Sequence, residues 1–357
     1  MKNSPIKQSN RYVNDLRRIY FSHDQVKQRR MVLLPFTIAA LFLVIAGIYG
    51  SMSLDVASED VVMLVSAAVI GGYMALNIGA NDVANNMGPA VGGKVLTVAA
   101  AVIIAAVCES AGALLAGGDV VKTVAKGIIN PGDGVDIGDF RNLMLSALLA
   151  AALWINLATF MNAPVSTTHS IVGGVMGAGI AGAGFGLVNW TTMSKIAASW
   201  VISPVFGGLV AAGLLFLIKV KILNAQDRNQ AARRWVPVLI GLMSSAFMAY
   251  MAMKGLKKIW KPSVEVIVLY AILSFFITWF ISIPFIKKQA ENLGNRKKQI
   301  NTLFNVPLII GVALLCFAHG ANDVANAVGP LAAIVSTFTD PSVAAKVSIP
   351  LWVMIIG

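Results

Sequence analysis

The sequence predicts an all-α polytopic membrane protein in which inverted repeats with broken helices meet at a site near the membrane midplane. Hydrophobic residues make up 57% of the 357 residues and charged residues 12%, with a mean hydropathy of +0.76. Soluble domains carry about 25% charged residues, so this composition argues against a soluble globular fold. One polar stretch of eleven residues also occurs twice, each time directly after a long apolar run.

The basic charge of the chain does not indicate nucleic-acid binding. The net charge is +12, but Lys and Arg cluster in short segments between apolar runs, which is the pattern of cytoplasmic loops rather than of a groove for phosphodiesters. The two cysteines, Cys108 and Cys316, lie in apolar runs and predict neither a disulfide framework nor a CxxC metal site. Three histidines without metal-ligand spacing argue against a zinc enzyme.

The N-terminal part of the chain precedes the repeats. Residues 1–30 form a basic segment, and Met31–Gly50 follows at about the length that a bilayer requires. Eight basic residues before this run predict a cytoplasmic N-terminus. The next loop, Ser51–Asp60, carries three acids and no Lys or Arg, as expected for the outside. Residues 31–60 are therefore interpreted as an extra first span and its loop.

The remaining chain divides into three parts. We expect 61–218 to form a first transporter repeat, 219–302 to supply basic loops and linking spans, and 303–357 to begin a second repeat that is incomplete. The apolar runs that predict spans or helices are Val61–Ala80, Val95–Gly117, Asn142–Met161, Ile171–Val188, Ser194–Ile218, Val236–Met253, Ser263–Ile286 and Leu303–His319.

The basic loops predict how the two repeats are oriented. Residues 219–234 and 287–300 carry five Lys or Arg each, and Lys254–Lys261 carries four. If Pro164–Val188 crosses the membrane, the two richer loops lie inside and the repeats run in opposite directions, which is the arrangement we expect. If that segment is re-entrant, the repeats are parallel unless another segment supplies the missing crossing. Inverted repeats suit alternating access.

The repeated stretch is Gly79–Pro89 in the first copy and Gly320–Pro330 in the second. Nine of the eleven positions are identical, at an offset of 241 residues. Helix caps would explain one Asp and one Asn in each copy, but not nine identities. Because an ionisable residue beside hydrocarbon is costly, it marks a functional site by default. Its repetition is typical of a transporter built from internal repeats.

Both copies offer oxygen ligands to a cation. We expect helix breaks at Gly79–Gly88, Pro164–Gly174 and Gly320–Gly329, because each stretch combines Gly or Pro with short polar side chains. Hard alkali cations prefer oxygen ligands, including freed backbone carbonyls. The spacing of Asn81 and Asn85 puts two amides on one helix face. The expected coupling-cation ligands are Asn81, Asp82, Asn85, Asn322, Asp323 and Asn326.

The sequence leaves the coupling ion open. Because desolvation disfavours a charged carboxylate, Asp82 and Asp323 could carry protons as readily as bind Na⁺. Glu109 is a further acid in the middle of a span, and its cost there makes it a candidate for a transport-essential residue.

A run of hydroxyls indicates an anion site. Ser166, Thr167 and Thr168 follow Pro164, and Pro is favoured in the first turn of a helix. A new helix N-terminus presents free N–H groups and the positive end of the helix dipole, which suits an anion. The alternative is that these hydroxyls bond back to helix carbonyls. Four hydroxyls within five residues favour the anion site.

The two Gly-Ala-Asn-Asp-Val-Ala-Asn copies, together with Glu109–Gly112 and Pro164–Gly174, resemble the signature of the inorganic phosphate transporter (PiT) family. The resemblance covers most of 61–340. It implies secondary active uptake of inorganic phosphate with Na⁺ or H⁺. It further implies that Asp82 and Asp323, with the neighbouring Asn residues, serve the cations and border the phosphate. The hydroxyls at 166–168 would hold phosphate oxygens, and Glu109 would match a glutamate tied to phosphate transport.

One feature departs from the family pattern. The family carries the Ser-Thr-Thr-His element twice, and the offset would place its second copy near position 407, beyond Gly357. We therefore expect a partial copy of the transporter. A permease for sulfate or another tetrahedral oxyanion is the alternative function, and an ion channel is the alternative of another class.

The expected setting is a multi-pass protein of the bacterial inner membrane. Its expected partners are inorganic phosphate, Na⁺ or H⁺, and the lipid bilayer, without nucleic acid, and the sequence also allows a homo-oligomer. We expect neither enzyme activity nor a cofactor, apart from Na⁺ as a coupling ion.

Overall fold

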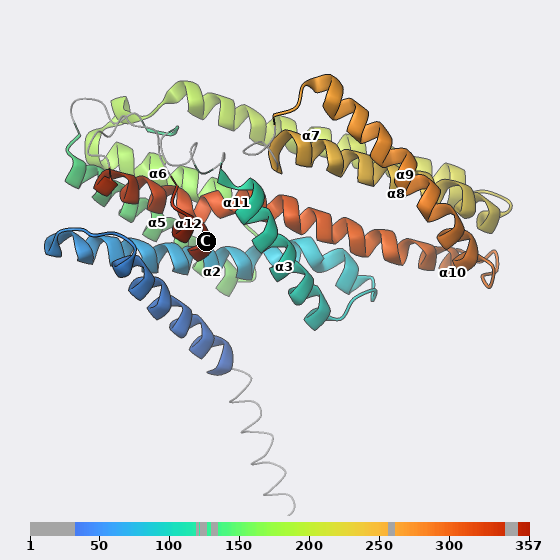
Figure 1. Ribbon diagram of the computed structural model, residues 1–357, viewed down its shortest axis with the longest axis horizontal. Coiled ribbons are helices and arrows are strands. Elements are labelled where there is room, and N and C mark those ends of the chain that lie inside the picture. Colours follow the sequence, from blue (N-terminus) through green and yellow to red (C-terminus); the bar gives the residue numbers. More distant parts are fainter. Residues whose placement is uncertain (1–32, 119–120, 122–126, 130–134, 256–260, 340–348) are drawn as a thin grey trace, which may run out of the picture.

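The computed structural model describes residues 33–118, 121, 127–129, 135–255, 261–339 and 349–357 (Figure 1). The predicted basic segment 1–30 lies outside the described residues. Within these ranges, eight helices are long and apolar enough to cross a membrane, which confirms the all-α polytopic class. The helical elements are Leu33–Met52, α2 (Ser58–Gly92), α3 (Val98–Ala116), α5 (Ile137–Phe160), α6 (Thr167–Ala183), η1 (Phe185–Leu187), α7 (Trp190–Ile218), η2 (Lys219–Leu223), α8 (Arg228–Tyr250), η3 (Met251–Gly255), α9 (Val264–Ala290), α10 (Lys297–Asn301), η4 (Thr302–Phe304), α11 (Asn305–Thr339) and α12 (Leu351–Ile356).

The two motif copies lie on two antiparallel helices, α2 and α11, each 35 residues long. Arg141 of α5 shows their direction, because it bonds Asp60 at the start of α2 and Thr337 near the end of α11, both at 2.7 Å. Further along, Gly71 of α2 faces Leu331 of α11. The inverted orientation of the repeats predicted from the basic loops is thereby confirmed.

Two of the three predicted helix breaks are wrong, because α2 and α11 run without interruption through Gly79–Gly88 and Gly320–Gly329. The polar side chains of both copies bond to neighbouring elements and leave the helical backbone intact. Gly320 of the second copy instead allows α11 to pack closely against α3. A methyl group added at Gly320 would lie 2.6 Å from the Cα atom of Glu109 on α3, so the two helices cross in near-backbone contact.

The third predicted break is confirmed. Helix α5 ends where Asn162 adopts the left-handed region, with φ of 55°, a conformation that Asn tolerates at helix ends. Helix α6 then returns along α5, with Gly174 packed on the backbone of Ala147. Residues 161–166 form the tip of this α5–α6 hairpin. Pro164 lies before the N-cap of α6 rather than in its first turn.

The hairpin tip ends part-way along the motif helices. It lies level with Asp82 and Asp323, which both bond Thr167. Beyond this level α2 continues to Gly92, about 15 Å further at 1.5 Å per residue, and α11 begins about 27 Å earlier. The segment Pro164–Val188 therefore turns back along α5 at a level part-way along both motif helices, and whether it crosses the membrane stays a prediction.

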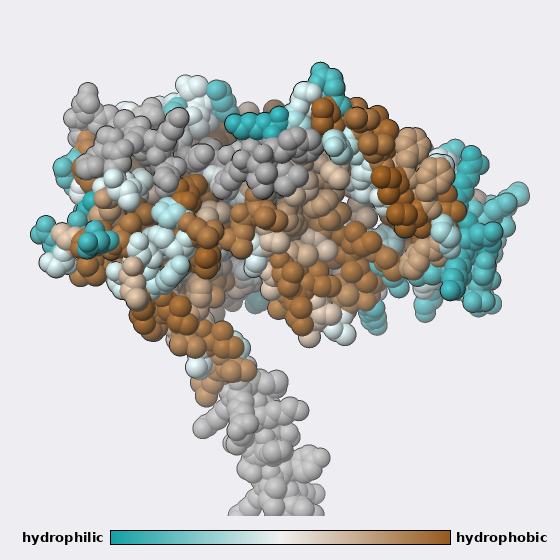
Figure 2. Space-filling view, viewed as in Figure 1, coloured by the Kyte–Doolittle hydropathy of each residue, from teal (hydrophilic) through white to brown (hydrophobic). Residues whose placement is uncertain are grey.

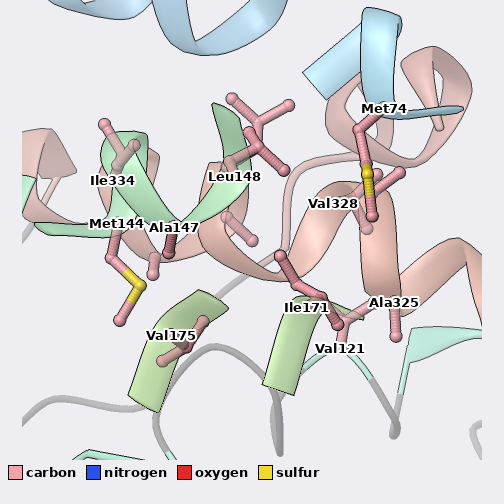
Figure 3. Packing of buried hydrophobic residues seen from close by; sticks show 14 of the residues in the cluster. Met74, Val121, Met144, Ala147, Leu148, Ile171, Val175, Ala325, Val328 and Ile334 are labelled. Atoms are coloured by element: carbon pink, nitrogen blue, oxygen red, sulfur yellow. The ribbon is translucent and has the colours of Figure 1, made fainter. Parts of the chain in front are cut away.

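A core of small and aliphatic side chains holds the hairpin against the motif helices (Figure 3). Met74 of α2, Leu148 of α5, Ile171 of α6 and Val328 of α11 are all buried in it. Alanines fill much of the remainder, which lets the helix backbones approach closely. This packing fixes the position of the hairpin tip relative to both motif copies.

The two basic loops lie together at one end of the molecule. The backbone N–H of Arg228 donates to Asn295 Oδ1 at 2.6 Å, and Asn229 Nδ2 donates to the carbonyl of Ala290 at 2.9 Å. Loops 219–234 and 287–300 thus share a side, as predicted. In the most hydrophobic 18-residue stretch of α7 no residue is buried within the protein, and in that of α9 only 6% of the residues are buried. In Figure 2, hydrophobic surface adjoins the hydrophilic surface at the end of the molecule where the two basic loops lie.

Candidate functional site

The site forms where α2, α3 and α11 meet the tip of the hairpin. Thr167, the first residue of α6, is buried between the two motif copies. Its Oγ1 lies 3.1 Å from Asp82 Oδ2 and 2.8 Å from Asp323 Oδ2. One hydroxyl proton is thus shared between two carboxylates that are 241 positions apart in the chain. The structure therefore unites the predicted cation residues with the predicted anion element.

His319 links the three acids of the site. Its Nε2 lies 3.1 Å from Asp323 Oδ2 and 3.5 Å from Asp82 Oδ2, and its Nδ1 lies 3.3 Å from Glu109 Oε1. The sequence interpretation gave His319 no role. Ligand atoms of Asp82, His319 and Asp323 lie within 4.8 Å of one another, close enough to surround one cation.

Glu109 reaches the cluster from α3, and its predicted role in transport stays a prediction. Its position follows from the close crossing of α3 and α11, where a methyl group at Gly112 would lie 2.8 Å from the carbonyl carbon of Phe317. Asn86 Nδ2 donates to Glu109 Oε1 at 3.0 Å. Asn86 was not predicted, and it stands at one of the two positions where the motif copies differ.

The four predicted asparagines separate into two that touch the hairpin and two that do not. Asn326 donates to Thr167 Oγ1 at 3.2 Å and to Thr168 Oγ1 at 3.0 Å. Asn81 donates to the carbonyl of Ala163 and accepts from the N–H of Val165. Both are buried.

Asn85 and Asn322 are exposed. Asn85 lies one turn beyond Asn81 on α2, past the hairpin tip, so the two amides do not share one environment, and the role of Asn85 as a cation ligand stays a prediction. Asn322 Nδ2 contacts Asp323 Oδ1 at 2.8 Å from the exposed side. These two amides therefore border the described cluster without contacting the hairpin.

The predicted hydroxyls take different positions. Ser166 is exposed and serves as the N-cap of α6, since its Oγ accepts from the backbone N–H of His169 at 3.2 Å. Ser170 bonds back to the carbonyl of Ser166 at 2.8 Å, which is the alternative that such residues offer. Thr167 and Thr168 point instead to the motif helices. The predicted helix N-terminus is confirmed, and it faces the two aspartates.

A cavity of about 380 Å³ adjoins the cluster. It is lined by Gly79 of α2, Glu109 and Ser110 of α3, and His319 and Asp323 of α11. Met354 of α12 also lines it, so the wall away from the acids is apolar. Two of the three carboxylates and the imidazole thus line the cavity, while Asp82 and the N-terminus of α6 contact the same cluster through Asp323, His319 and Thr167.

This arrangement has an excess of negative charge. Three carboxylates face one imidazole within a part-buried space, where charges are screened less than in water. An anion is repelled by such a cluster until cations bind. The oxygens of Asp82, Asp323, Thr167 and Asn326 are the hard ligands that an alkali cation prefers.

Comparison with known proteins agrees with this chemistry. The family described as "Phosphate transporter family" matches residues 78–357. A "Putative phosphate permease" of Helicobacter pylori (strain J99) is 47% identical over 327 residues, which cover 91% of this chain and 61% of that protein. A relative of the same description from Pyrococcus horikoshii is 37% identical over 295 residues, covering 82% of this chain and 72% of that protein.

A solved structure shows the same architecture. It is described as "The sodium-dependent phosphate transporter", and it is 36% identical to this chain with a TM-score of 0.76. The match covers 83% of this chain and 72% of the other. The chain spans about three fifths of the length of the Helicobacter relative that it matches.

Proposed function

The chain belongs to the phosphate transporter family, a family of permeases rather than enzymes, and we propose that it takes part in Na⁺-coupled transport of inorganic phosphate across a membrane. One observation carries the proposal: the hydroxyl-bearing N-terminus of α6 lies between Asp82 and Asp323 of two inverted motif copies. Cation ligands and an anion-binding helix end thereby share one site. The sodium dependence of the transporter with the similar solved structure supports Na⁺ over H⁺.

The charge of the site gives an order of binding. Asp82, Asp323 and Glu109 repel a phosphate anion at close range, so cations bind first and neutralise the carboxylates. Phosphate then reaches the first turn of α6, where N–H groups lack intrahelical acceptors and the dipole is positive. Each anion therefore enters only with cations, which couples its movement to the ion gradient.

The inverted repeat extends the proposal to a second half-site. Asn81 of the first copy corresponds to Asn322 of the second, and Asn85 corresponds to Asn326. Asn81 and Asn326 touch the α5–α6 hairpin, whereas their counterparts are exposed. A second hydroxyl element related to the hairpin by the repeat would meet Asn85 and Asn322. Exchange between the two half-sites would give alternating access.

Binding and uptake of labelled phosphate test this function. We expect the purified chain to bind phosphate in Na⁺ but not in choline. Proteoliposomes of a form that also carries the second hydroxyl element should take phosphate up saturably when Na⁺ is higher outside. Asp82→Asn and Asp323→Asn should abolish both, whereas Asp55→Asn in an exposed loop should not. Tighter binding of sulfate would favour the oxyanion alternative, and uptake without saturation would favour a channel. Phosphate binding that is equal in Na⁺ and choline would contradict the proposal.

A further inference from the structure

A second cavity lies far from the motif site, at the basic end of the molecule. It occupies about 720 Å³ between the start of α8 and the end of α9. The loops that meet there, 219–234 and 287–300, contain ten Lys or Arg and two acidic residues. This concentration of positive charge requires an anionic partner or a strongly hydrated surface.

The cavity is built from basic and amphipathic side chains. Arg233, Arg234 and Lys287 line it together with Gln230 and Trp235. The acid at its rim, Asp227, accepts from the backbone N–H of Gln230 at 3.0 Å as the N-cap of α8. That carboxylate is thereby engaged with its own helix, and the positive side chains face the space.

One guanidinium is held in place by the fold. Arg233 Nε donates to Asn229 Oδ1 at 2.7 Å, and Arg233 Nη2 donates to the carbonyl of Ala290 at 3.2 Å. Three of its five N–H donors remain for a ligand. Arg234 and Lys287 are exposed and make no ion pair within the described part of the chain. Their charges are therefore available to an anion in the cavity.

The surface beside the cavity is apolar. Ile283 lines it, and Phe280, Ile281 and Phe285 of α9 are 50–68% exposed in the turns just before Lys287. Figure 2 shows this transition as a hydrophilic end adjoining hydrophobic helices. Trp235 lies at the boundary, with Lys221 Nζ 5.9 Å from its ring centroid, and Trp is enriched at membrane interfaces.

We propose that this cavity binds the headgroup of an anionic phospholipid whose acyl chains lie along α9. The phosphate ester would contact Arg233, Arg234 and Lys287, and basic pockets between membrane helices are suited to such headgroups. A free phosphate ion would match the charge but not the adjoining apolar surface. The basic segment 1–30 of the same chain has the wrong sign of charge to occupy the cavity. The bound lipid would relieve repulsion between α8 and α9.

Lipid binding to the purified, delipidated chain tests this site. We expect phosphatidylglycerol to bind in native mass spectrometry and phosphatidylcholine not to bind. The pair Arg234→Gln and Lys287→Gln should weaken phosphatidylglycerol about thirtyfold, because each basic side chain near an anionic surface contributes about a factor of five. The charge-preserving pair Arg234→Lys and Lys287→Arg should bind as the parent does.

A matched pair provides the control. Lys195 near the start of α7 and Lys261 just before α9 are both exposed, and both lie at the helix ends away from the basic loops. Lys195→Gln with Lys261→Gln should change phosphatidylglycerol binding less than twofold. An equal loss in both pairs would overturn the proposal, since net charge alone would then explain binding. So would displacement of the lipid by millimolar inorganic phosphate, which would identify a free-anion site. Equal binding of phosphatidylcholine would also refute it.

Discussion

Substitution of Gly320 tests whether the motif glycines serve close helix contact. A Cβ atom at Gly320 would lie 2.6 Å from Glu109 Cα and 2.7 Å from Glu109 C, whereas ordinary van der Waals contacts are 3.4–4 Å. Gly320→Ala must therefore move α3 away from α11 by about 1 Å. Overpacking of this kind costs about 1–3 kcal/mol. Because Glu109 lies at the crossing, the same movement withdraws its carboxylate from His319.

The first motif copy supplies a matched control. Gly79 occupies the equivalent position, and a methyl group there would have no neighbour within 4 Å. Gly79→Ala should therefore leave stability unchanged or raise it by up to about 1 kcal/mol, because Ala is the better helix former.

Unfolding in mixed detergent micelles measures both variants, and Na⁺ binding reports the displacement of Glu109. We expect Gly320→Ala to unfold first and to bind Na⁺ more weakly than the parent. If both glycine variants unfold at the same detergent ratio as the parent, the close crossing of α3 and α11 is wrong.

Three further substitutions test individual contacts of the site and of the helix ends. Thr167→Val removes a hydroxyl that bonds two carboxylates and one amide. Because a hydrogen bond to a charged group contributes about 1.5–3 kcal/mol, we expect Na⁺ affinity measured by isothermal titration to fall at least tenfold. Thr167→Ser keeps the hydroxyl and should restore most of the affinity. Asn86→Asp places a carboxylate about 3.0 Å from Glu109 and should lower thermal stability in Na⁺-free buffer, whereas Asn85→Asp, on the exposed side, should change it little. Arg141→Gln breaks the contacts that join the start of α2 to the end of α11, so we expect a loss of about 2 kcal/mol in unfolding free energy. Arg141→Lys should recover only part of it, because Lys lacks the planar fork, and full recovery would show that charge alone maintains the junction.

The sequence was sufficient for the helical class and for most of the candidate site. Apolar runs located the membrane helices, since span length is set by bilayer thickness. The basic loops predicted an inverted orientation that Arg141 confirms through its two contacts. The hydroxyl run correctly marked the N-terminus of α6, because Ser and Thr are strong N-cap residues.

The predicted helix breaks show what local composition does not contain. Gly and Asn near Asp82 and Asp323 have low helix propensity, which favoured broken backbones. In the fold, Asn81 and Asn326 find acceptors on the hairpin, and Gly320 permits the approach of α3. These partners are distant in the sequence, so tertiary packing decides the backbone conformation at both motif copies.

The residues that the sequence interpretation missed are those that differ between the two copies. His319, which contacts all three acids, corresponds to Ile78 in the first copy, and Asn86 corresponds to Ala327 in the second. A search for identity between repeats therefore passes over both. Identity is expected where each half performs the same task, as the two aspartates do. A single imidazole suffices because Nε2 of His319 lies within reach of both Asp82 of the first copy and Asp323 of the second. The second repeat can therefore supply the imidazole while the first keeps the apolar Ile78 at the equivalent position.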